Sequence, residues 1–277
     1  MILSEIEQRI KAKIEAIGTP LKEWNINIYR GILTGYNDAF IIDKAKKEEI
    51  LANCQSEEEL KKTDELIRPI LRGRDIKRYG YEFADLYIIT TFPSLKIDIE
   101  LYPAVKQHLL SFGYDRLKQT GEKGARKKTN NKWFETQDSI GYWEDFFKQK
   151  IVYPNMTKFM PFFLDNENFL VNQKCFIMTG EKLAYLTAFL NSNIFKICYR
   201  DNFPELQGGT RELSKIFFEQ MKIPDIQHII NEDFDILVDD MQKGEDNASL
   251  RLERALILAL GLEEYEDYIL SYDINLQ

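Results

Sequence analysis

The sequence predicts an α+β fold, with a mixed β-sheet, flanking helices and a helical C-terminal tail. Short apolar runs bounded by Pro, Gly or charged residues, as strands commonly are, occupy 24–29, 86–91, 150–156 and 175–179. Apolar residues spaced three and four apart, as on one face of a helix, occupy 4–17 and 181–200, and the sequence after 225 is also helical in pattern. Both kinds of element are therefore expected.

The first quarter of the chain is expected to hold a lead-in helix, a strand–turn–strand unit and one or two charged helices. Four isoleucines form one apolar stripe in 4–17, and Gly18 and Pro20 end this helix. Apolar and polar residues alternate before a polar turn and an apolar run, so 24–42 is predicted as a strand, a turn and a second strand. Residues 44–67 are rich in charge and indicate a helix, or two helices broken near Asn53.

The longest helical pattern is EKLAYLTAFLNSNIFKICYR at 181–200, in which Asn191 and Ser192 either bend the helix or face a partner. Farther along, Asn247 is expected to cap the start of a helix and Gly261 to stop it. The sequence becomes helical and acidic after Pro224. These changes predict a lead-in linker helix at 1–19, a domain at 20–224 and an acidic helical tail at 225–277.

Charge is distributed unevenly along the chain, whose formal net charge is −8. After Pro224, 14 acidic residues stand against 3 basic ones, a net of −11. Residues 1–224 then hold 34 basic and 31 acidic residues, a net of +3. The sequence therefore describes a mildly basic body with an acidic tail, and the body remains compatible with a polyanionic partner.

Composition argues against several classes of protein. No run of about 18 apolar residues is present, so no membrane span is expected. Three widely spaced cysteines without a CxxC pair indicate reduced thiols and a cytoplasmic protein. With only His108 and His228 and no Cys/His cluster, no metal site is expected.

Motifs that would indicate catalysis are missing. The chain has no glycine-rich strand-to-helix turn for a methyl-donor cofactor, no phosphate loop and no nucleophile elbow, so no catalytic residue is predicted. One enzymatic alternative stays open, a metal-dependent nuclease that uses Asp43, Glu59 and Lys61. Glu59 and Lys61 form the only Glu-x-Lys pair, yet they lie in a segment typical of a solvated helix face.

The basic segment 114–133 carries the first binding signal. It holds seven Lys and Arg against two acidic residues, a net of +5, with two glycines and no apolar period. A long, flexible cationic loop suits a nucleic-acid backbone, because each cation can neutralise a phosphate; a mobile, solvated loop is the alternative. The candidate DNA contacts are Arg116, Lys123, Arg126, Lys127, Lys128, Lys132 and Trp133.

Three shorter stretches add candidates. The arginine-rich stretch 67–79 suits recognition of phosphate or a guanine edge, or alternatively intramolecular salt bridges. The turn at 30–38 and the glycine-containing stretch 206–214 can each offer donors to phosphate, although a tight turn or a plain loop favours the same residues. The candidates from these stretches are Arg30, Thr34, Tyr36, Asn37, Arg72, Arg74, Lys77 and Arg211.

Five stretches in one order resemble a known family. They are WNINIYRGILTGYNDAFIID (24–43), IRPILRGRDIKRY (67–79), KIVYPN (150–155), LNSN (190–193) and GGTREL…MKIP (208–224). Together they closely resemble the TaqI-like C-terminal specificity domain. That is the DNA target-recognition domain that follows the adenine-N6 methyltransferase domain in Type IIG restriction-modification enzymes and related phage-defence methylases. The resemblance covers nearly the whole chain.

The resemblance implies a division of labour. A methyltransferase domain or subunit, absent from this chain, would bind S-adenosylmethionine, flip the target adenine and methylate it. This chain would need no cofactor of its own; it would read the sequence of double-stranded DNA and hold the duplex against the catalytic cleft. It would be the non-catalytic specificity part of a DNA methyltransferase or restriction endonuclease. The acidic tail would be a spacer or a packing element.

A third hypothesis comes from the charge distribution. The chain is a protein-interaction module in this hypothesis, its acidic tail docks a partner, and DNA binding is incidental. A fragment ending at residue 224 would then lose its partner, whereas a recognition domain would keep its DNA binding.

Overall fold

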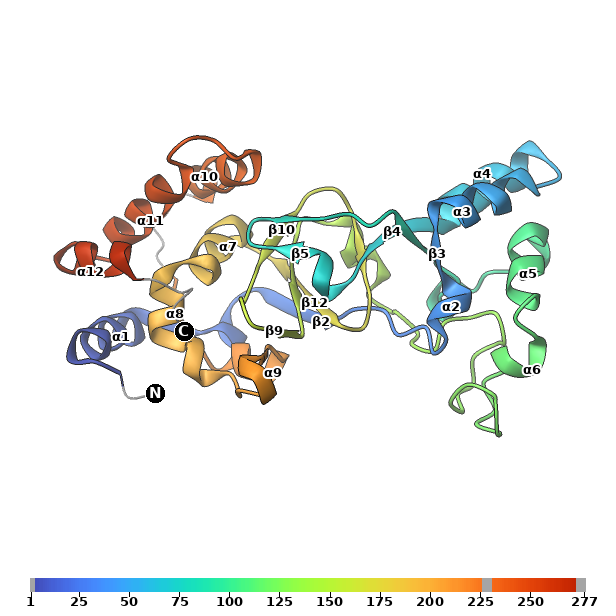
Figure 1. Ribbon diagram of the computed structural model, residues 1–277, viewed down its shortest axis with the longest axis horizontal. Coiled ribbons are helices and arrows are strands. Elements are labelled where there is room, and N and C mark those ends of the chain that lie inside the picture. The colour runs from blue at the N-terminus through green and yellow to red at the C-terminus, as the bar shows by residue number, and fades with distance from the viewer. Residues whose placement is uncertain (1–2, 226–230, 273–277) are drawn as a thin grey trace.

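Two small β-sheets occupy the middle of an elongated molecule, and helices lie at both ends (Figure 1). The computed structural model describes residues 3–225 and 231–272, so His228 and parts of the predicted tail lie outside the described residues. Strands and helices alternate irregularly along the chain, which confirms the α+β prediction. None of the helices that the structure describes is long and apolar enough to cross a bilayer.

The first sheet is antiparallel and has the order β10-β8-β12-β2. Its strands are β2 (Ile26–Arg30), β8 (Lys150–Pro154), β10 (Phe163–Asp165) and β12 (Cys175–Gly180). Every residue of β8 is buried, because the sheet is covered on both faces. A lysine and an aspartate face each other across β8 and β10, and the resulting Lys150–Asp165 ion pair is fully buried with 2.5 Å between Nζ and Oδ2.

The second sheet is mixed and has the order β11-β4-β7-β3. Its strands are β3 (Ile41–Asp43), β4 (Ile67–Leu71), β7 (Leu86–Ile89) and β11 (Leu170–Val171), and only the β11–β4 pair is parallel. Three two-stranded ribbons complete the β structure. They pair β1 (Gly18–Pro20) with β14 (Lys222–Pro224), β5 (Ile76–Lys77) with β6 (Gly80–Tyr81), and β9 (Met156–Thr157) with β13 (Arg211–Glu212).

Helices at one end of the molecule extend from the second sheet (Figure 1). They are α2 (Asn37–Phe40), α3 (Lys44–Ala52), α4 (Glu57–Leu66), α5 (Pro103–Leu110) and α6 (Tyr114–Leu117). The predicted break near Asn53 is confirmed, since α3 ends there and Ser56 caps α4 through a bond from the Glu59 amide. The predicted strand–turn–strand unit is wrong in one respect: α2 intervenes, and β2 and β3 belong to different sheets.

The opposite end holds the remaining helices. They are α1 (Glu5–Ile17), α7 (Leu183–Asn191), α8 (Asn193–Tyr199), α9 (Lys215–Glu219), α10 (Asn231–Lys243), α11 (Ala248–Ala259) and α12 (Glu266–Ser271). The long helical pattern does bend, because Ser192 ends α7 and caps α8 by accepting from the Phe195 amide. Asn191 is buried and bonds the main chain of Phe162, so it faces the core and not a partner.

The helices after Pro224 share one hydrophobic core with α7 and α8. Phe234, Leu252 and Leu256 are buried in the same cluster as Leu186 and Phe195. The division near residue 225 is thus a change of charge and composition, and the core continues across it. Gly261 follows α11 with φ +65°, as predicted for a helix stop. Asn247 precedes α11, but its side chain makes no capping hydrogen bond, which corrects the predicted role.

Candidate nucleic-acid interface

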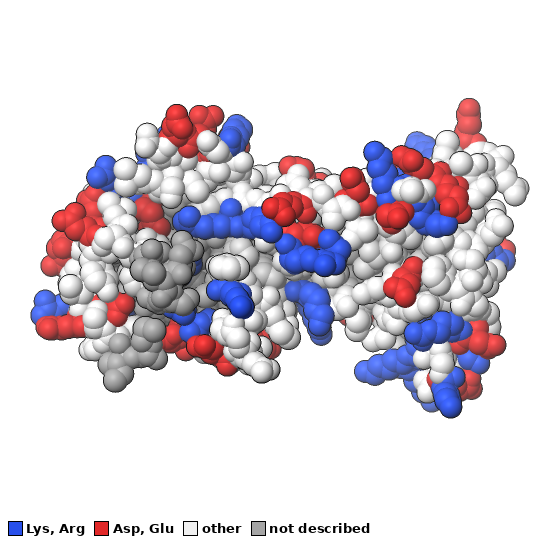
Figure 2. Space-filling view, viewed as in Figure 1, with Lys and Arg blue, Asp and Glu red and all other residues white. Residues whose placement is uncertain are grey.

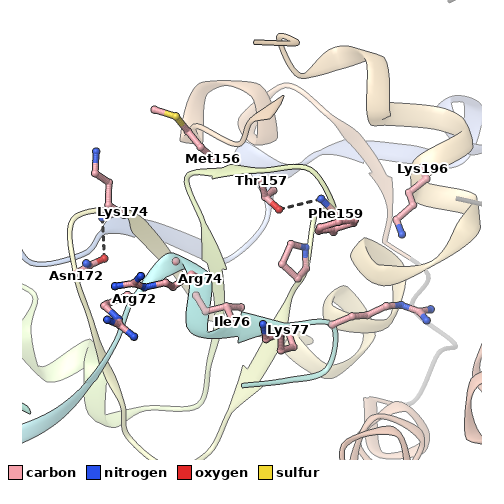
Figure 3. Close-up of a pocket in the computed structure, with 13 residues that line it drawn as sticks. Arg72, Arg74, Ile76, Lys77, Met156, Thr157, Phe159, Asn172, Lys174 and Lys196 are labelled. Carbon is pink, nitrogen blue, oxygen red and sulfur yellow. Dashed lines mark hydrogen bonds between the residues drawn. The ribbon is translucent and has the colours of Figure 1, made fainter. Parts of the chain in front are cut away.

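A groove of about 860 Å³ lies on the middle of the molecule, and we call it the basic groove after the residues that line it (Figure 3). The stretch around η2 (Gly73–Asp75) and β5, the loop between β9 and β10, the turn before β12 and helix α8 form its walls. The lining residues are Arg72, Gly73, Arg74, Ile76, Lys77, Arg78, Met156, Thr157, Phe159, Pro161, Asn172, Lys174 and Lys196. Six of these thirteen are Lys or Arg, and none is Asp or Glu.

The wall around η2 is fixed by an internal ion pair. Arg72 donates from Nε to Asp75 Oδ2 at 2.9 Å and from Nη2 to Oδ1 at 2.8 Å, and Asp75 also accepts from the Arg72 amide. The bidentate geometry raises the pKa of Arg72 and holds its guanidinium in place. The salt-bridge alternative therefore holds for Arg72, and Lys77 Nζ also lies 3.3 Å from Glu82 Oε2, although the side chains of Arg74 and Lys77 are exposed.

The opposite wall places a cation and an apolar group at the rim. Lys174 lies in the turn between β11 and β12, where its amide donates to Asn172 Oδ1 at 3.1 Å. Phe159 stands on the β9–β10 loop, held by a bond from its amide to Thr157 Oγ1, and its side chain is among the most exposed apolar groups at 71%. Met156 of β9 is 51% exposed nearby. A groove with cations and an exposed aromatic ring suits a phosphate backbone and the bases attached to it.

Surface charge follows the same pattern on the face shown in Figure 2. Lysine and arginine side chains run across the middle of this face, and acidic side chains gather over the C-terminal helices at one end. A second group of basic side chains lies at the opposite end, near α6. A polyanion on this face would be attracted to the middle and repelled by the C-terminal helices.

The sequence and the structure agree in part on the groove. Three predicted contacts, Arg72, Arg74 and Lys77, do lie together in it. Sequence reasoning missed Lys174 and Lys196, which come from a short turn and a buried helix about 100 and 120 residues later. No local charge cluster marks either lysine, so only the packing of β12 and α8 brings them to the groove.

The basic segment 114–133 is ordered around a buried arginine, which corrects the prediction of a flexible loop. Arg126 is 2% exposed and donates to the carbonyls of Leu117, Thr34 and Trp133, each at 2.7 Å. It is thus an internal anchor and not a presented DNA contact. The exposed basic side chains of the segment are those of Arg116, Lys123, Lys127, Lys128 and Lys132, while Trp133 is half-buried against Tyr114.

The turn at 30–38 adjoins this basic segment. Thr34 is fully buried and donates to Asn37 Oδ1 while accepting from the Tyr36 amide, so Thr34 builds the turn and does not face DNA. Gly35 has φ +79°, which the turn requires. Arg116 lies over the Tyr36 ring at 4.2 Å, which joins the turn to the segment.

The other candidates of this turn differ in exposure. Arg30 and Asn37 are exposed. Arg30 and Lys127 both act on Asp138, whose pKa is raised by burial and lowered by these two cations. The turn and the basic segment therefore form one surface at this end of the molecule, and we call it the loop surface: Arg30, Asn37, Arg116, Lys123, Lys127, Lys128 and Lys132.

Arg211 has a structural role, which corrects its prediction as a DNA contact. The side chain is 6% exposed and donates from Nη1 to the carbonyls of Arg200 and Phe203. Its Nη2 pairs with Asp201 and Glu205, each at 3.2 Å. The guanidinium is satisfied within the chain, so it is not available to a phosphate.

The residues of the nuclease hypothesis do not form a site. Glu59 is 6% exposed, and its two oxygens accept from the amides of Gln55 and Ala104. Asp43 caps α3 by accepting from the Lys46 amide. In the part of the chain that the structure describes, no group of three or more His, Cys, Asp or Glu residues could hold a metal ion.

Comparison with known proteins identifies one family and two solved structures of similar fold. The model of the TaqI-like C-terminal specificity domain matches residues 68–223. The crystal structure of the type IIG restriction endonuclease BpuSI is similar with a TM-score of 0.56 and 16% identity, over 95% of this chain and 33% of that one. The Type IIL restriction-modification enzyme MmeI, solved in complex with DNA, gives a TM-score of 0.54 and 12% identity, over 88% and 34%.

The TM-scores show that this chain shares its fold with part of each enzyme. The chain spans about a third of the length of each of the two enzymes. No curated protein matches this chain in sequence.

Proposed function

Because this chain belongs to the family of TaqI-like C-terminal specificity domains found in type IIG restriction-modification enzymes, we propose that it recognises a short sequence in double-stranded DNA. The basic groove is the observation that carries this proposal. It combines six Lys and Arg side chains with no acidic lining residue and an exposed aromatic ring.

The groove divides the work of binding between phosphates and bases. Lys174 and Lys77 have exposed side chains suited to neutralising phosphates, which releases counterions and gives affinity without sequence preference; Lys77 would exchange its surface ion pair with Glu82 for a phosphate. Arg74 is exposed beside the rigid Arg72–Asp75 pair and has the planar fork that matches a guanine edge. A good bidentate contact of this kind is worth about 1–3 kcal/mol of discrimination between bases.

The loop surface provides a second contact with the duplex backbone. Its lysines and arginines are exposed, and Arg126 holds the segment beneath them in one conformation. An ordered surface loses less conformational entropy on binding than a flexible loop would. We assign sequence-independent attraction of the DNA backbone to the loop surface. We assign both this attraction and the reading of the base sequence to the basic groove.

Catalysis belongs to another part of the enzyme in this proposal. A methyltransferase domain or subunit binds S-adenosylmethionine and methylates an adenine at N6, in the cytoplasm, while this chain positions the duplex for it. No residue described above is assigned a chemical step, and the buried, satisfied carboxylate of Glu59 gives the nuclease alternative no support.

Salt-dependent binding to duplex DNA tests the proposal. The chain is compared with a groove variant, Arg74→Gln, Lys77→Gln and Lys174→Gln, and with a control that removes three exposed cations elsewhere, Lys22→Gln, Lys44→Gln and Lys243→Gln. The slope of log affinity against log salt is negative, and each lost phosphate contact makes it shallower by about 0.9. The slope of the groove variant should therefore be shallower by about 2–3.

The control variant should keep a slope close to that of the unaltered chain. Equal slopes for the groove variant and the unaltered chain would refute the assignment of the groove. Phe159→Ala gives an independent check, because loss of an uncharged contact should weaken binding and leave the slope unchanged.

A further inference from the structure

Lys196 of the basic groove has a mostly buried side chain whose ammonium group reaches the groove. Lys196 lies on α8, is 6% exposed and lines the groove, and Figure 3 shows its side chain leaving the helix with the ammonium group turned toward the groove. Among the residues that the structure describes, none forms a hydrogen bond or an ion pair with this ammonium group. Buried charges in proteins are normally paired, so the free protein holds Lys196 at an energetic cost.

The surroundings of Lys196 increase this cost. The charged groups that act on it are Arg78 from the stretch after β5, Arg200 after α8 and Glu253 from α11. Glu253 is the only anion of the three, and its Oε1 already accepts from the Asn193 amide and lies 4.0 Å from Arg78. Burial and the two arginines lower the pKa of Lys196 to about 8.

We propose that Lys196 is the seat of a backbone phosphate of the bound DNA, within the basic groove. The inference rests on the proposed function and adds a defined contact to it. A phosphodiester entering the groove supplies a counter-ion whose two non-bridging oxygens accept hydrogen bonds, and the exposed Phe159 ring lines the same groove. Arg78, on the groove wall and 40% exposed, can contact the same phosphate.

The chemistry of the groove favours a phosphate of a polymer over an isolated anion. A single carboxylate would neutralise one of the six cations, whereas successive phosphates of a duplex strand can meet Lys196, Arg74, Lys77 and Lys174 together. The groove volume of about 860 Å³ also exceeds what one small anion fills.

The inference has a consequence for pH. Since the free protein has a Lys196 pKa of about 8, about nine in ten of these side chains are neutral at pH 9. A phosphate beside the ammonium group raises its pKa again, so DNA binding takes up a proton at pH 9. Affinity for DNA should therefore fall as pH rises through 8, by up to about tenfold for each pH unit.

The test measures binding of a random-sequence duplex between pH 7 and 9.5 at constant salt. Lys196→Gln should bind about tenfold more weakly at pH 7 and lose the fall above pH 8, whereas Lys196→Arg should bind tightly with a flat profile, because arginine stays charged. Lys243→Gln, which removes an exposed lysine from α10, should keep the profile of the unaltered chain. Calorimetry in buffers of different ionisation heat counts the proton taken up at pH 9.

The outcomes separate this inference from the proposed function. If the unaltered chain binds the duplex and Lys196→Gln has the same affinity and the same pH profile, the phosphate seat is wrong and the proposed function stands. If the unaltered chain binds no duplex at any pH, both are wrong. A Lys196→Arg profile that still falls above pH 8 would also overturn the inference, since another group would then carry the titration.

Discussion

Replacing Arg126 should unfold the basic segment and lower the stability of the chain. In Arg126→Met the apolar part of the side chain is kept, but the guanidinium, whose carbon lies 5.1 Å from the centre of the Phe40 ring, is removed. The variant loses three hydrogen bonds of 2.7 Å, to the carbonyls of Leu117, Thr34 and Trp133. The turn at 30–38 and the segment 114–133 are then no longer tied together.

The magnitude follows from these three bonds. A hydrogen bond from a charged donor is worth about 1.5–3 kcal/mol, which sets a range of about 4.5–9 kcal/mol for the three bonds. The carbonyls of Leu117 and Thr34 are buried, but they gain access to water once the segment loosens, so we expect a loss near the low end of this range, about 3–5 kcal/mol. For a chain of this size about 1 kcal/mol corresponds to about 2–4 °C in Tm, so a decrease of roughly 6–20 °C is predicted.

Thermal unfolding and amide hydrogen exchange together provide the assay. The amides of residues 119–129 should exchange much faster in Arg126→Met than in the unaltered chain, and Arg126→Lys should be intermediate because lysine lacks the planar fork. A Tm within about 1 °C of the unaltered chain, with the exchange of this segment unchanged, would refute the role of Arg126 as an anchor.

Three other predictions concern charge. Lys127→Gln with Lys128→Gln should weaken binding of all duplex sequences equally and flatten the salt dependence by about one unit per lysine, and an unchanged slope would remove them from the interface. Lys150→Ala should destabilise the chain by about 3–5 kcal/mol because the buried Asp165 loses its partner, whereas Lys150→Met with Asp165→Leu should cost less; denaturant unfolding distinguishes the two. Burial lowers the pKa of His108 below its usual 6.5, so its contribution to stability is present above pH 6.5 and is lost as pH falls below it; His108→Gln should reduce this fall in Tm, and an identical pH profile would contradict the assignment.

The sequence predicts most of the elements because local patterns determine them. The stripe of isoleucines predicts α1, and the charged segment predicts α3, α4 and the break at Asn53. The family is recognisable from the sequence for the same reason, since each of its motifs is a contiguous stretch of the chain. The α7–α8 break is also foreshadowed, because Ser192 is a residue that can cap a new helix.

Which charged residues are buried could not be predicted from local sequence patterns. Arg126 stands next to Lys127 and Lys128, yet of these three only Arg126 is buried. One of the carbonyls that it bonds, that of Thr34, lies 92 residues earlier in the chain, so the local sequence does not reveal this burial. Arg211 and Lys196 are equally indistinguishable from surface cations in sequence. Their roles depend on long-range packing, which places Arg211 among carbonyl and carboxylate acceptors and Lys196 in a groove lined by no Asp or Glu.

Selection of bound fragments from a pool of random duplex DNA, at two salt concentrations, tests the central claim most directly. The unaltered chain and the variant Arg74→Gln, Lys77→Gln and Lys174→Gln are compared, and the retained DNA is sequenced. We predict that the unaltered chain retains duplexes enriched in one short motif, that higher salt lowers retention, and that the variant loses most of it. Equal retention by the two proteins, or none by the unaltered chain at either salt concentration, would contradict recognition of DNA through the basic groove.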